Sequence, residues 1–183
     1  MKIFGLAGWS GSGKTTLLVR LLPELIGRGL TVSTAKHAHH AFDIDTPGKD
    51  SYEHRAAGAR EVMVSSAKRW ALVREHRGAR ESTLGELIAL MHPVDLVVVE
   101  GFKSESHDKL EVHRAGLGKP LLVAQDPNVV AVAADQPLAS LSVPVLNLDD
   151  TVAIADFVVA HCGLAAPSAT APRDARPVLA GRD

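Results

Sequence analysis

One stretch near the amino end constrains the fold more than any other: Gly-Trp-Ser-Gly-Ser-Gly-Lys-Thr-Thr at residues 8–16. It fits the pattern G-x-x-x-x-G-K-[ST], in which glycines let the backbone turn tightly and aim successive N–H groups at phosphate oxygens. An apolar run at residues 3–7 precedes the pattern, and leucines at helical spacing follow it. This order of strand, loop and helix predicts a phosphate-binding loop and makes a chance match the weaker interpretation.

The motif also predicts a role for two individual side chains of the loop. Lys14 supplies a point charge for the outer phosphates of a nucleotide, and Thr15 supplies a hydroxyl for Mg²⁺. The helix that begins here points its positive end at the same place. The predicted nucleotide ligands in this stretch are Gly11, Ser12, Gly13, Lys14, Thr15 and Thr16.

Length and composition limit the other possibilities. A chain of 183 residues is long enough for one well-buried domain, which we expect over residues 1–163. The net charge of −1 provides no basic field, so we expect no nucleic-acid partner. Cys162 is the single cysteine, which excludes an internal disulfide and fits a reducing compartment. We find no leader and no apolar run long enough for a bilayer, and therefore expect a cytoplasmic protein without a membrane partner.

The remaining patterns predict a P-loop NTPase-type three-layer α/β fold with a mostly parallel central sheet and one antiparallel hairpin. Pro23 interrupts the first helix, which either kinks there or restarts with Pro23 in a first turn. Asp50 or Ser51 is expected to cap the second helix. Residues 164–183 lack periodicity and are expected to form a disordered tail. Strands are predicted at residues 2–7, 30–35, 61–66, 69–74, 95–103, 110–113, 121–124, 129–135 and 143–148, and helices at 14–27, 52–58, 82–92 and 151–162.

Glu100 ends the most apolar of these strands, Asp-Leu-Val-Val-Val-Glu at residues 95–100. At about 3.3 Å per residue Asp95 and Glu100 are roughly 16 Å apart, so only Glu100 can lie at the edge that carries the phosphate-binding loop. We predict that Glu100 and Thr15 together lie nearest Mg²⁺, and that Glu100 acts in catalysis. Its extra methylene, compared with the aspartate usual at this position, leaves open whether it holds Mg²⁺ through water or orients the attacking water.

Residues 36–51 are rich in histidine and aspartate and leave the second strand at the same edge. We predict that Asp43 and Asp45 face the γ-phosphate there and act in catalysis. Two alternatives stay open. The histidines, which are His37, His39 and His40, could bind a transition metal, although no closed set of four ligands is present. The segment could also be an ordinary solvated loop.

The sequence gives a weaker indication of which residue would recognise the nucleotide base. The chain lacks the N-K-x-D motif that common GTPases use for guanine. Asp135 ends an apolar strand, and a carboxylate at that point can accept the N1 and exocyclic amino hydrogens of guanine, which adenine cannot offer together. Asp126 is the rival candidate.

Three stretches taken together resemble the molybdopterin-guanine dinucleotide biosynthesis adapter proteins, the MobB family. They are the run at residues 8–16, Lys-His-Ala-His-His-Ala-Phe-Asp-Ile-Asp-Thr-Pro-Gly-Lys-Asp-Ser at 36–51, and Val-Glu-Gly-Phe-Lys at 99–103. The resemblance covers about residues 1–163. It implies a homodimeric GTP-binding protein with weak Mg²⁺-dependent GTPase activity. It also implies two partners, the guanylyltransferase that joins GMP to molybdopterin and molybdopterin itself.

Two other activities compete with this interpretation. A small-molecule kinase would use the same loop together with an arginine-rich lid, but the arginines at residues 69–80 lie on a predicted strand and turn. A guanylyltransferase attacks the α-phosphate and releases pyrophosphate, whereas a lysine in this kind of loop grips the β- and γ-phosphates. Both alternatives fit the sequence less well than a GTP-binding adapter.

Overall fold

The structure is a computed structural model that describes residues 1–38, 42–139 and 141–164. These residues group into two compact units. The first unit contains Met1–Ala35 together with the chain from Pro93 onward, and the second is Lys36–His92. The boundaries expected for a single nucleotide-binding domain, residues 1–163, stay a prediction. The expected disordered tail lies outside the described residues except for Leu164.

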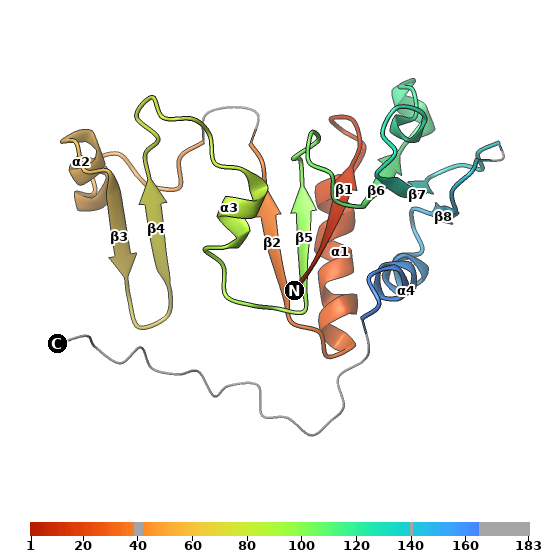
Figure 1. Cartoon of the computed structure of the whole chain (residues 1–183), viewed down its shortest axis with the longest axis horizontal. Helices are drawn as coiled ribbons and strands as arrows, with labels where there is room; N and C mark the ends of the chain where they lie inside the picture. Colours follow the sequence, from red (N-terminus) through yellow and green to blue (C-terminus); the bar gives the residue numbers. More distant parts are fainter. Residues whose placement is uncertain (39–41, 140, 165–183) are drawn as a thin grey trace. The chain divides into compact units, whose positions relative to one another are not determined.

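A six-stranded sheet in the order β2-β5-β1-β6-β7-β8 forms the centre of the first unit (Figure 1). Strand β1 runs parallel to both of its neighbours, and β6, β7 and β8 continue the parallel pairing. The carboxyl ends of these strands therefore meet at one edge of the sheet. The strands are β1 (Lys2–Ala7), β2 (Val32–Lys36), β5 (Leu96–Glu100), β6 (Lys109–His113), β7 (Val129–Ala134) and β8 (Val145–Asn147).

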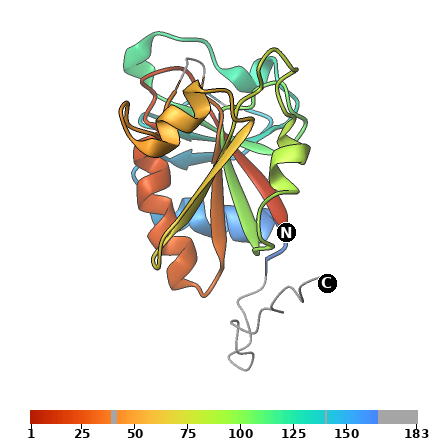
Figure 2. The same ribbon diagram turned by 90° about the vertical axis from the view of Figure 1, so that its left-hand side faces the viewer.

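One face of this sheet packs against helices α1 (Lys14–Gly27) and α4 (Thr151–His161). Figures 1 and 2 show α1 running alongside the strands. Alternate strand residues point to this face because side chains alternate along a strand. Strand β5 is buried over its whole length, which explains why its sequence is an uninterrupted valine run. The core on this face includes Phe4, Leu6, Leu17, Leu21, Leu25, Val98, Leu110, Val112, Ile154 and Val158.

Pro23 lies inside α1, which continues to Gly27, so the helix does not restart there, and the predicted kink stays a prediction. A proline leaves the carbonyl four residues earlier without its helical partner. That residue is Val19, whose side chain is 64% exposed, and Pro23 is exposed as well. Water can therefore satisfy the carbonyl, and the buried leucines on the opposite side keep the helix continuous.

The other face of the sheet brings polar side chains against Gly5 at the centre of β1. A Cβ added to Gly5 would lie 2.5 Å from His107 Nε2 and 2.8 Å from Lys109 Cγ. Lys109 is only 1% exposed, and its ammonium donates to Glu105 O (2.7 Å) and pairs with Asp126 (3.1 Å). Glycine is therefore required here for close approach rather than for backbone conformation.

We expect Gly5→Ala to lower the free energy of unfolding by about 1–3 kcal/mol, because two side chains of a packed layer would have to move. Urea unfolding followed by circular dichroism measures the change. Gly27→Ala is the matched control, since a Cβ there meets nothing within 4 Å and alanine favours the helix. Equal unfolding midpoints for Gly5→Ala and the unchanged protein would contradict the predicted overpacking.

The strand predicted at residues 121–124 is wrong. This segment forms a short 3-10 helix, η2 (Leu122–Ala124). The reason is a long-range contact: the Glu111 carboxylate, completely buried in β6, accepts the N–H groups of Leu122 (2.8 Å) and Val123 (2.9 Å). These N–H groups satisfy a buried charge instead of pairing with a neighbouring strand.

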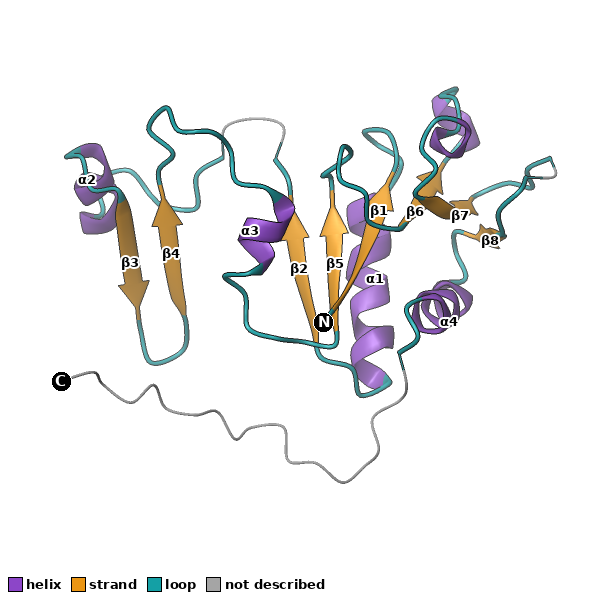
Figure 3. Ribbon diagram, in the orientation of Figure 1, coloured by secondary structure: helices purple, strands orange, loops and turns teal. Residues whose placement is uncertain are grey.

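The second unit contains an antiparallel hairpin, β3 (Glu61–Ser65) and β4 (Trp70–Arg74), as the sequence predicts (Figure 3). It also contains α2 (Asp50–Ala56) and α3 (Leu84–Ile88). Lys49, and not Asp50 or Ser51, is the N-cap of α2, so that predicted cap is wrong. The Ser51 hydroxyl instead donates to Asp45 Oδ1 (2.9 Å).

Helix α3 lies within the helix predicted at residues 82–92 but is shorter than those eleven residues. Thr83 and Glu86 form a capping box in which each side chain accepts from the other residue's backbone N–H. Within the ranges that the structure describes, no helix combines the length and the apolar character needed to cross a membrane.

Candidate functional site

The glycine-rich loop lies between β1 and α1 at the carboxyl edge of the sheet. Gly8, Gly11 and Gly13 have φ angles of 143°, 81° and 95°, a region that residues with a side chain rarely adopt. Gly8 has a second constraint, since a Cβ there would lie 2.5 Å from the Val112 carbonyl oxygen. The glycines thus allow the loop to fold back tightly on itself, which confirms the local structure predicted from the motif.

Lys14 and Ser12 line this loop from within. The Lys14 ammonium donates to the carbonyl oxygens of Gly8 (2.9 Å) and Trp9 (3.0 Å). The Ser12 hydroxyl is buried and has no hydrogen-bond partner among the described residues. The N-cap residue of α1 is Gly13, which has no side chain to cap the helix. The loop is therefore a polar cradle suited to an anion. It offers the Lys14 ammonium, the unpartnered Ser12 hydroxyl and the N–H groups at a helix terminus whose N-cap is a glycine.

Thr15 and Glu100 meet at the mouth of the cradle. The Thr15 hydroxyl lies 3.0 Å from Glu100 Oε1 and 3.2 Å from Oε2. Parallel pairing of β1 with β5 sets Glu100 opposite Leu6, just before the loop begins. Hydroxyl and carboxylate oxygens are the ligands that Mg²⁺ takes in nucleotide sites, so this pair fits the ion. Asp95, at the other end of β5, accepts from the Thr31 N–H and hydroxyl (2.7 Å each) and serves the fold.

Arg114 was missed by the sequence analysis. It leaves β6, and its Nε donates to the Ser12 carbonyl (3.2 Å) while its guanidinium lies over Gly13. Its Nη1 is 3.6 Å from Asp135 Oδ2. One signal could have found it: Arg114 follows a strand at the edge where the phosphate-binding loop is expected. The strand order that makes β6 a neighbour of β1 is not visible in the sequence.

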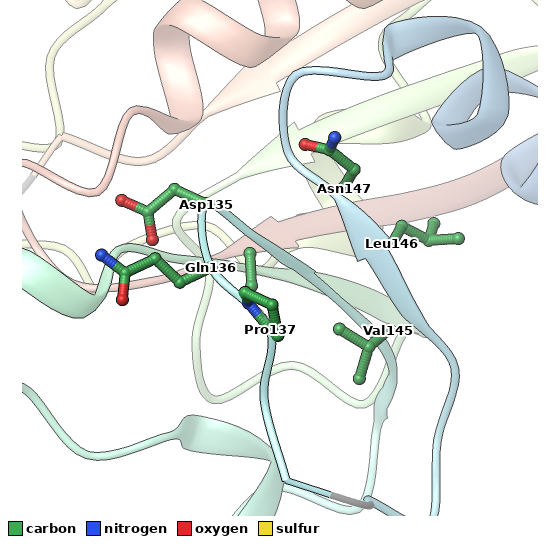
Figure 4. A pocket seen from close by; sticks show the side chains of 7 residues that line it. Asp135, Gln136, Pro137, Val145, Leu146 and Asn147 are labelled. Atoms are coloured by element: carbon green, nitrogen blue, oxygen red, sulfur yellow. The ribbon is translucent and has the colours of Figure 1, made fainter.

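Asp135 follows β7 at the same edge, as predicted. Its Oδ1 accepts the Ala115 N–H (3.0 Å), and its side chain borders a pocket of about 280 Å³ between the ends of β7 and β8. Figure 4 shows Asp135 and Asn147 extending from the ends of the two strands, with Pro137 and Val145 facing each other and Leu146 turned away. Small-molecule sites commonly combine apolar walls with a few polar groups, as this pocket does.

The rival base-reading candidate, Asp126, precedes β7 and therefore lies toward the opposite, amino edge of the sheet. Its carboxylate accepts the Asn128 N–H (2.9 Å) and pairs with the buried Lys109 ammonium (3.1 Å). Asp126 thus stabilises the fold, and Asp135 remains as the candidate.

Asp43 and Asp45 belong to the second unit, where Arg55 binds both. Two oxygens of Asp43 accept from Arg55 Nη2 at 2.9 Å each, and Asp45 Oδ2 lies 3.5 Å from Arg55 Nε. The hydrogen bond from Arg55 holds the pKa of Asp43 below its usual value, with help from the Asp45 backbone N–H. The roles predicted for these two carboxylates at the γ-phosphate stay predictions.

Two competing interpretations, a transition-metal site at the histidines and an arginine-rich kinase lid, also concern the second unit. Of the three histidines named above, His39 and His40 lie outside the described residues, and His37 contacts Glu81 (2.7 Å). No metal-binding group of histidine, cysteine and acidic side chains occurs within the described ranges. The arginines near the hairpin contact their own unit, where Arg74 pairs with Glu61 and Arg80 with Glu86.

The mostly parallel sheet, with a glycine-rich turn leading from β1 into α1, defines a P-loop NTPase-type α/β protein. A family model described as "Molybdopterin guanine dinucleotide synthesis protein B", MobB, matches residues 3–135, and the chain belongs to this family.

Named relatives agree with the family model. The chain is 46% identical over 160 residues to the molybdopterin-guanine dinucleotide biosynthesis adapter protein of Escherichia coli strain K12, covering 86% of this chain and 91% of that protein. It is 40% identical to the adapter protein of Haemophilus influenzae over 158 residues, covering 85% and 86% of the two chains. The solved structure of Bacillus subtilis MobB, at 28% identity, matches 88% of this chain and 98% of its own with a TM-score of 0.68.

Proposed function

We propose that this protein binds GTP together with Mg²⁺, hydrolyses GTP slowly, and acts as an adapter in molybdopterin guanine dinucleotide biosynthesis. The observation that carries the nucleotide part is the contact between Thr15 and Glu100 at the mouth of the glycine-rich loop. A hydroxyl and a buried carboxylate from distant parts of the chain meet where a P-loop protein needs its metal ligands.

Each residue of the cradle has a task in this proposal. The loop N–H groups and the amino end of α1 bind phosphate oxygens, with Gly11, Gly13 and Thr16 contributing backbone. The Lys14 ammonium exchanges its two carbonyl acceptors in the loop for the outer phosphates. Bound Mg²⁺ would neutralise charge on those phosphates, held by Thr15 and Glu100. Hydrolysis is slow because Glu100 serves both metal and attacking water.

Product analysis tests this activity. With GTP and Mg²⁺ we expect GDP and orthophosphate, formed in equal amounts. A phosphorylated small molecule would instead identify a kinase, and pyrophosphate a nucleotidyl transferase. The ion pairs of Arg74 and Arg80 within their own unit disfavour the kinase, because a lid needs arginines that can reach the nucleotide.

Guanine recognition is assigned to Asp135 and the neighbouring pocket. A carboxylate offers more than two acceptor positions, so Asp135 can keep the Ala115 N–H and still accept from a base. We expect GTP to bind more tightly than ATP, and Asp135→Asn to weaken GTP about tenfold while ATP binding changes little. Calorimetry with both nucleotides measures this.

Asp156→Asn is the matched control for Asp135→Asn, because Asp156 lies on the exposed side of α4, paired with Arg28. It should leave both affinities unchanged. Equal affinities of the unchanged protein for GTP and ATP would refute guanine recognition by this pocket.

Asp43 and Asp45 are proposed as sensors of the γ-phosphate. Arg55 binds both carboxylates, so a change at one is transmitted to the other and to the last turn of α2. The loop that carries them would order with GTP and loosen with GDP.

The adapter role rests on the family, whose relatives carry that name. We propose the guanylyltransferase that joins GMP to molybdopterin as the protein partner, with molybdopterin as a further ligand. A homodimer is part of the proposal and is supported by the hairpin, where Met63 and Trp70 are 64% and 59% exposed. The single cysteine leads us to place the protein in the cytoplasm.

A further inference from the structure

The indole of Trp9, on the outer side of the glycine-rich loop, has a fixed position. Its Nε1–H donates to the Pro120 carbonyl oxygen at 2.8 Å. Two ammonium groups lie near the ring: Lys103 Nζ is 5.8 Å and Lys119 Nζ 5.6 Å from its centroid. The three residues follow β1, β5 and β6, which are neighbours in the sheet, so all three lie at its carboxyl edge.

These two lysines differ from the buried lysine of the same unit. Lys109 pairs with a carboxylate, whereas neither Lys103 nor Lys119 has an acidic group within ion-pair distance in the part of the chain that the structure describes. A single exposed lysine is ordinary. Two lysines on one indole ring, neither with an acidic partner among the described residues, leave two positive charges uncompensated at this edge of the sheet, and an anion bound there would be stabilised by both.

The backbone holds both lysines in place. Lys103 follows Gly101 and Phe102, with φ angles of 95° and 37°, and the Phe102 side chain is only 8% exposed. Lys119 precedes Pro120, whose carbonyl is the acceptor of the Trp9 indole. Only the lysine side chains remain to be ordered when a ligand binds, which lowers the entropic cost of binding.

Trp9 joins this cluster to the glycine-rich loop. Its carbonyl oxygen accepts from Lys14 Nζ (3.0 Å) inside the loop, while its ring faces Lys103 and Lys119. Trp9 alone therefore links an anion bound at the two lysines to the Lys14 ammonium, which we assign to the nucleotide phosphates.

We propose that Trp9, Lys103 and Lys119 form a second anion site, which binds the phosphate group of a small-molecule phosphate monoester beside the nucleotide. Two ammonium charges match the charge of about −1.5 to −2 that a phosphate monoester carries at pH 7. The site rests on the proposed function in one respect, since the neighbouring loop is taken to hold GTP. It extends that function by identifying the second ligand as a phosphate monoester and by locating its binding site at Trp9, Lys103 and Lys119.

Trp9 itself provides the measurement. Trp70→Phe removes the other tryptophan of the chain, so the fluorescence excited at long wavelength comes from Trp9 alone. In this background the protein is saturated with Mg²⁺ and a non-hydrolysable GTP analogue, and phenyl phosphate is titrated in. We expect a saturable change in Trp9 fluorescence, a similar change with inorganic phosphate, and none with phenol.

The double variant Lys103→Gln/Lys119→Gln should weaken the response to phenyl phosphate at least about tenfold, because two charged donors are lost. Its affinity for the GTP analogue by calorimetry should be unchanged. Lys49→Gln, which removes an exposed lysine of the second unit, should change neither quantity.

Three results separate the alternatives. If the GTP analogue alone produces the full response and phenyl phosphate adds nothing, the lysines bind the γ-phosphate and the second site is refuted. No response to any phosphate also refutes it. If GTP fails to bind at all, the proposed function fails; a phosphate response of nucleotide-free protein that requires Lys103 and Lys119 but survives Lys14→Ala would still support the second site.

Discussion

Replacing Lys14 with alanine is expected to weaken GTP binding ten- to a hundredfold while the fold survives. The Lys14 ammonium lies across the glycine-rich loop on two carbonyl oxygens, so it is already in position when phosphates arrive. Losing its charge-assisted contacts should cost about 1.5–3 kcal/mol of binding free energy. Calorimetry with GTP measures the loss, and circular dichroism checks the fold.

Lys68→Ala is the matched control for this experiment, because Lys68 lies exposed in the turn of the hairpin. It removes the same charge from a place without a proposed ligand, so GTP affinity should not change. Unchanged affinity in Lys14→Ala, with an intact circular dichroism spectrum, would reject the loop as the phosphate site.

Glu100→Gln is expected to reduce GTP hydrolysis about ten- to a hundredfold and to abolish most of its Mg²⁺ dependence. The amide oxygen of glutamine can still accept the Thr15 hydroxyl, which lies 3.0 Å from Glu100 Oε1, so the local packing is kept. Only the negative charge is lost. GDP binding without metal should change little, and the rate of orthophosphate release over a Mg²⁺ titration measures the effect.

The control for Glu100→Gln is Asp95→Asn at the other end of the same strand. Asp95 accepts two hydrogen bonds from Thr31, so this variant should lower stability and leave the hydrolysis rate per folded molecule unchanged. Equal rates for Glu100→Gln and the unchanged protein would remove Glu100 from the metal site.

Local patterns predicted much of the fold correctly. The hairpin and the buried valine run of β5 were each predicted from neighbouring residues alone. In each case the deciding interaction spans few residues, or the strand is buried on both faces and shows this in its composition. Pro23 was harder to interpret, because its effect depends on whether water can reach the carbonyl left without a partner.

Contacts between residues that are not neighbours in the sequence determined the local structure where the sequence pattern predicted it wrongly. Residues 121–124 have the composition of a strand, yet the buried Glu111 carboxylate binds two of their N–H groups and forms η2. The expected strand failed because the deciding partner is a buried charge eleven and twelve residues before the two N–H groups that it accepts. Asp50 and Ser51 failed as caps for a similar reason, since Ser51 donates to Asp45 instead.

The sequence by itself determined the glycine-rich loop, the helix that follows it, and the buried strand that ends in Glu100. Their requirements are local: positive φ angles at Gly8, Gly11 and Gly13, and an apolar run with one acid at its end. The strand order β2-β5-β1-β6-β7-β8 was decided by the tertiary structure alone. That order brings Thr15 to Glu100, Arg114 to Asp135, and two lysines to Trp9, because side chains that follow neighbouring parallel strands meet at one edge however far apart they lie in the chain.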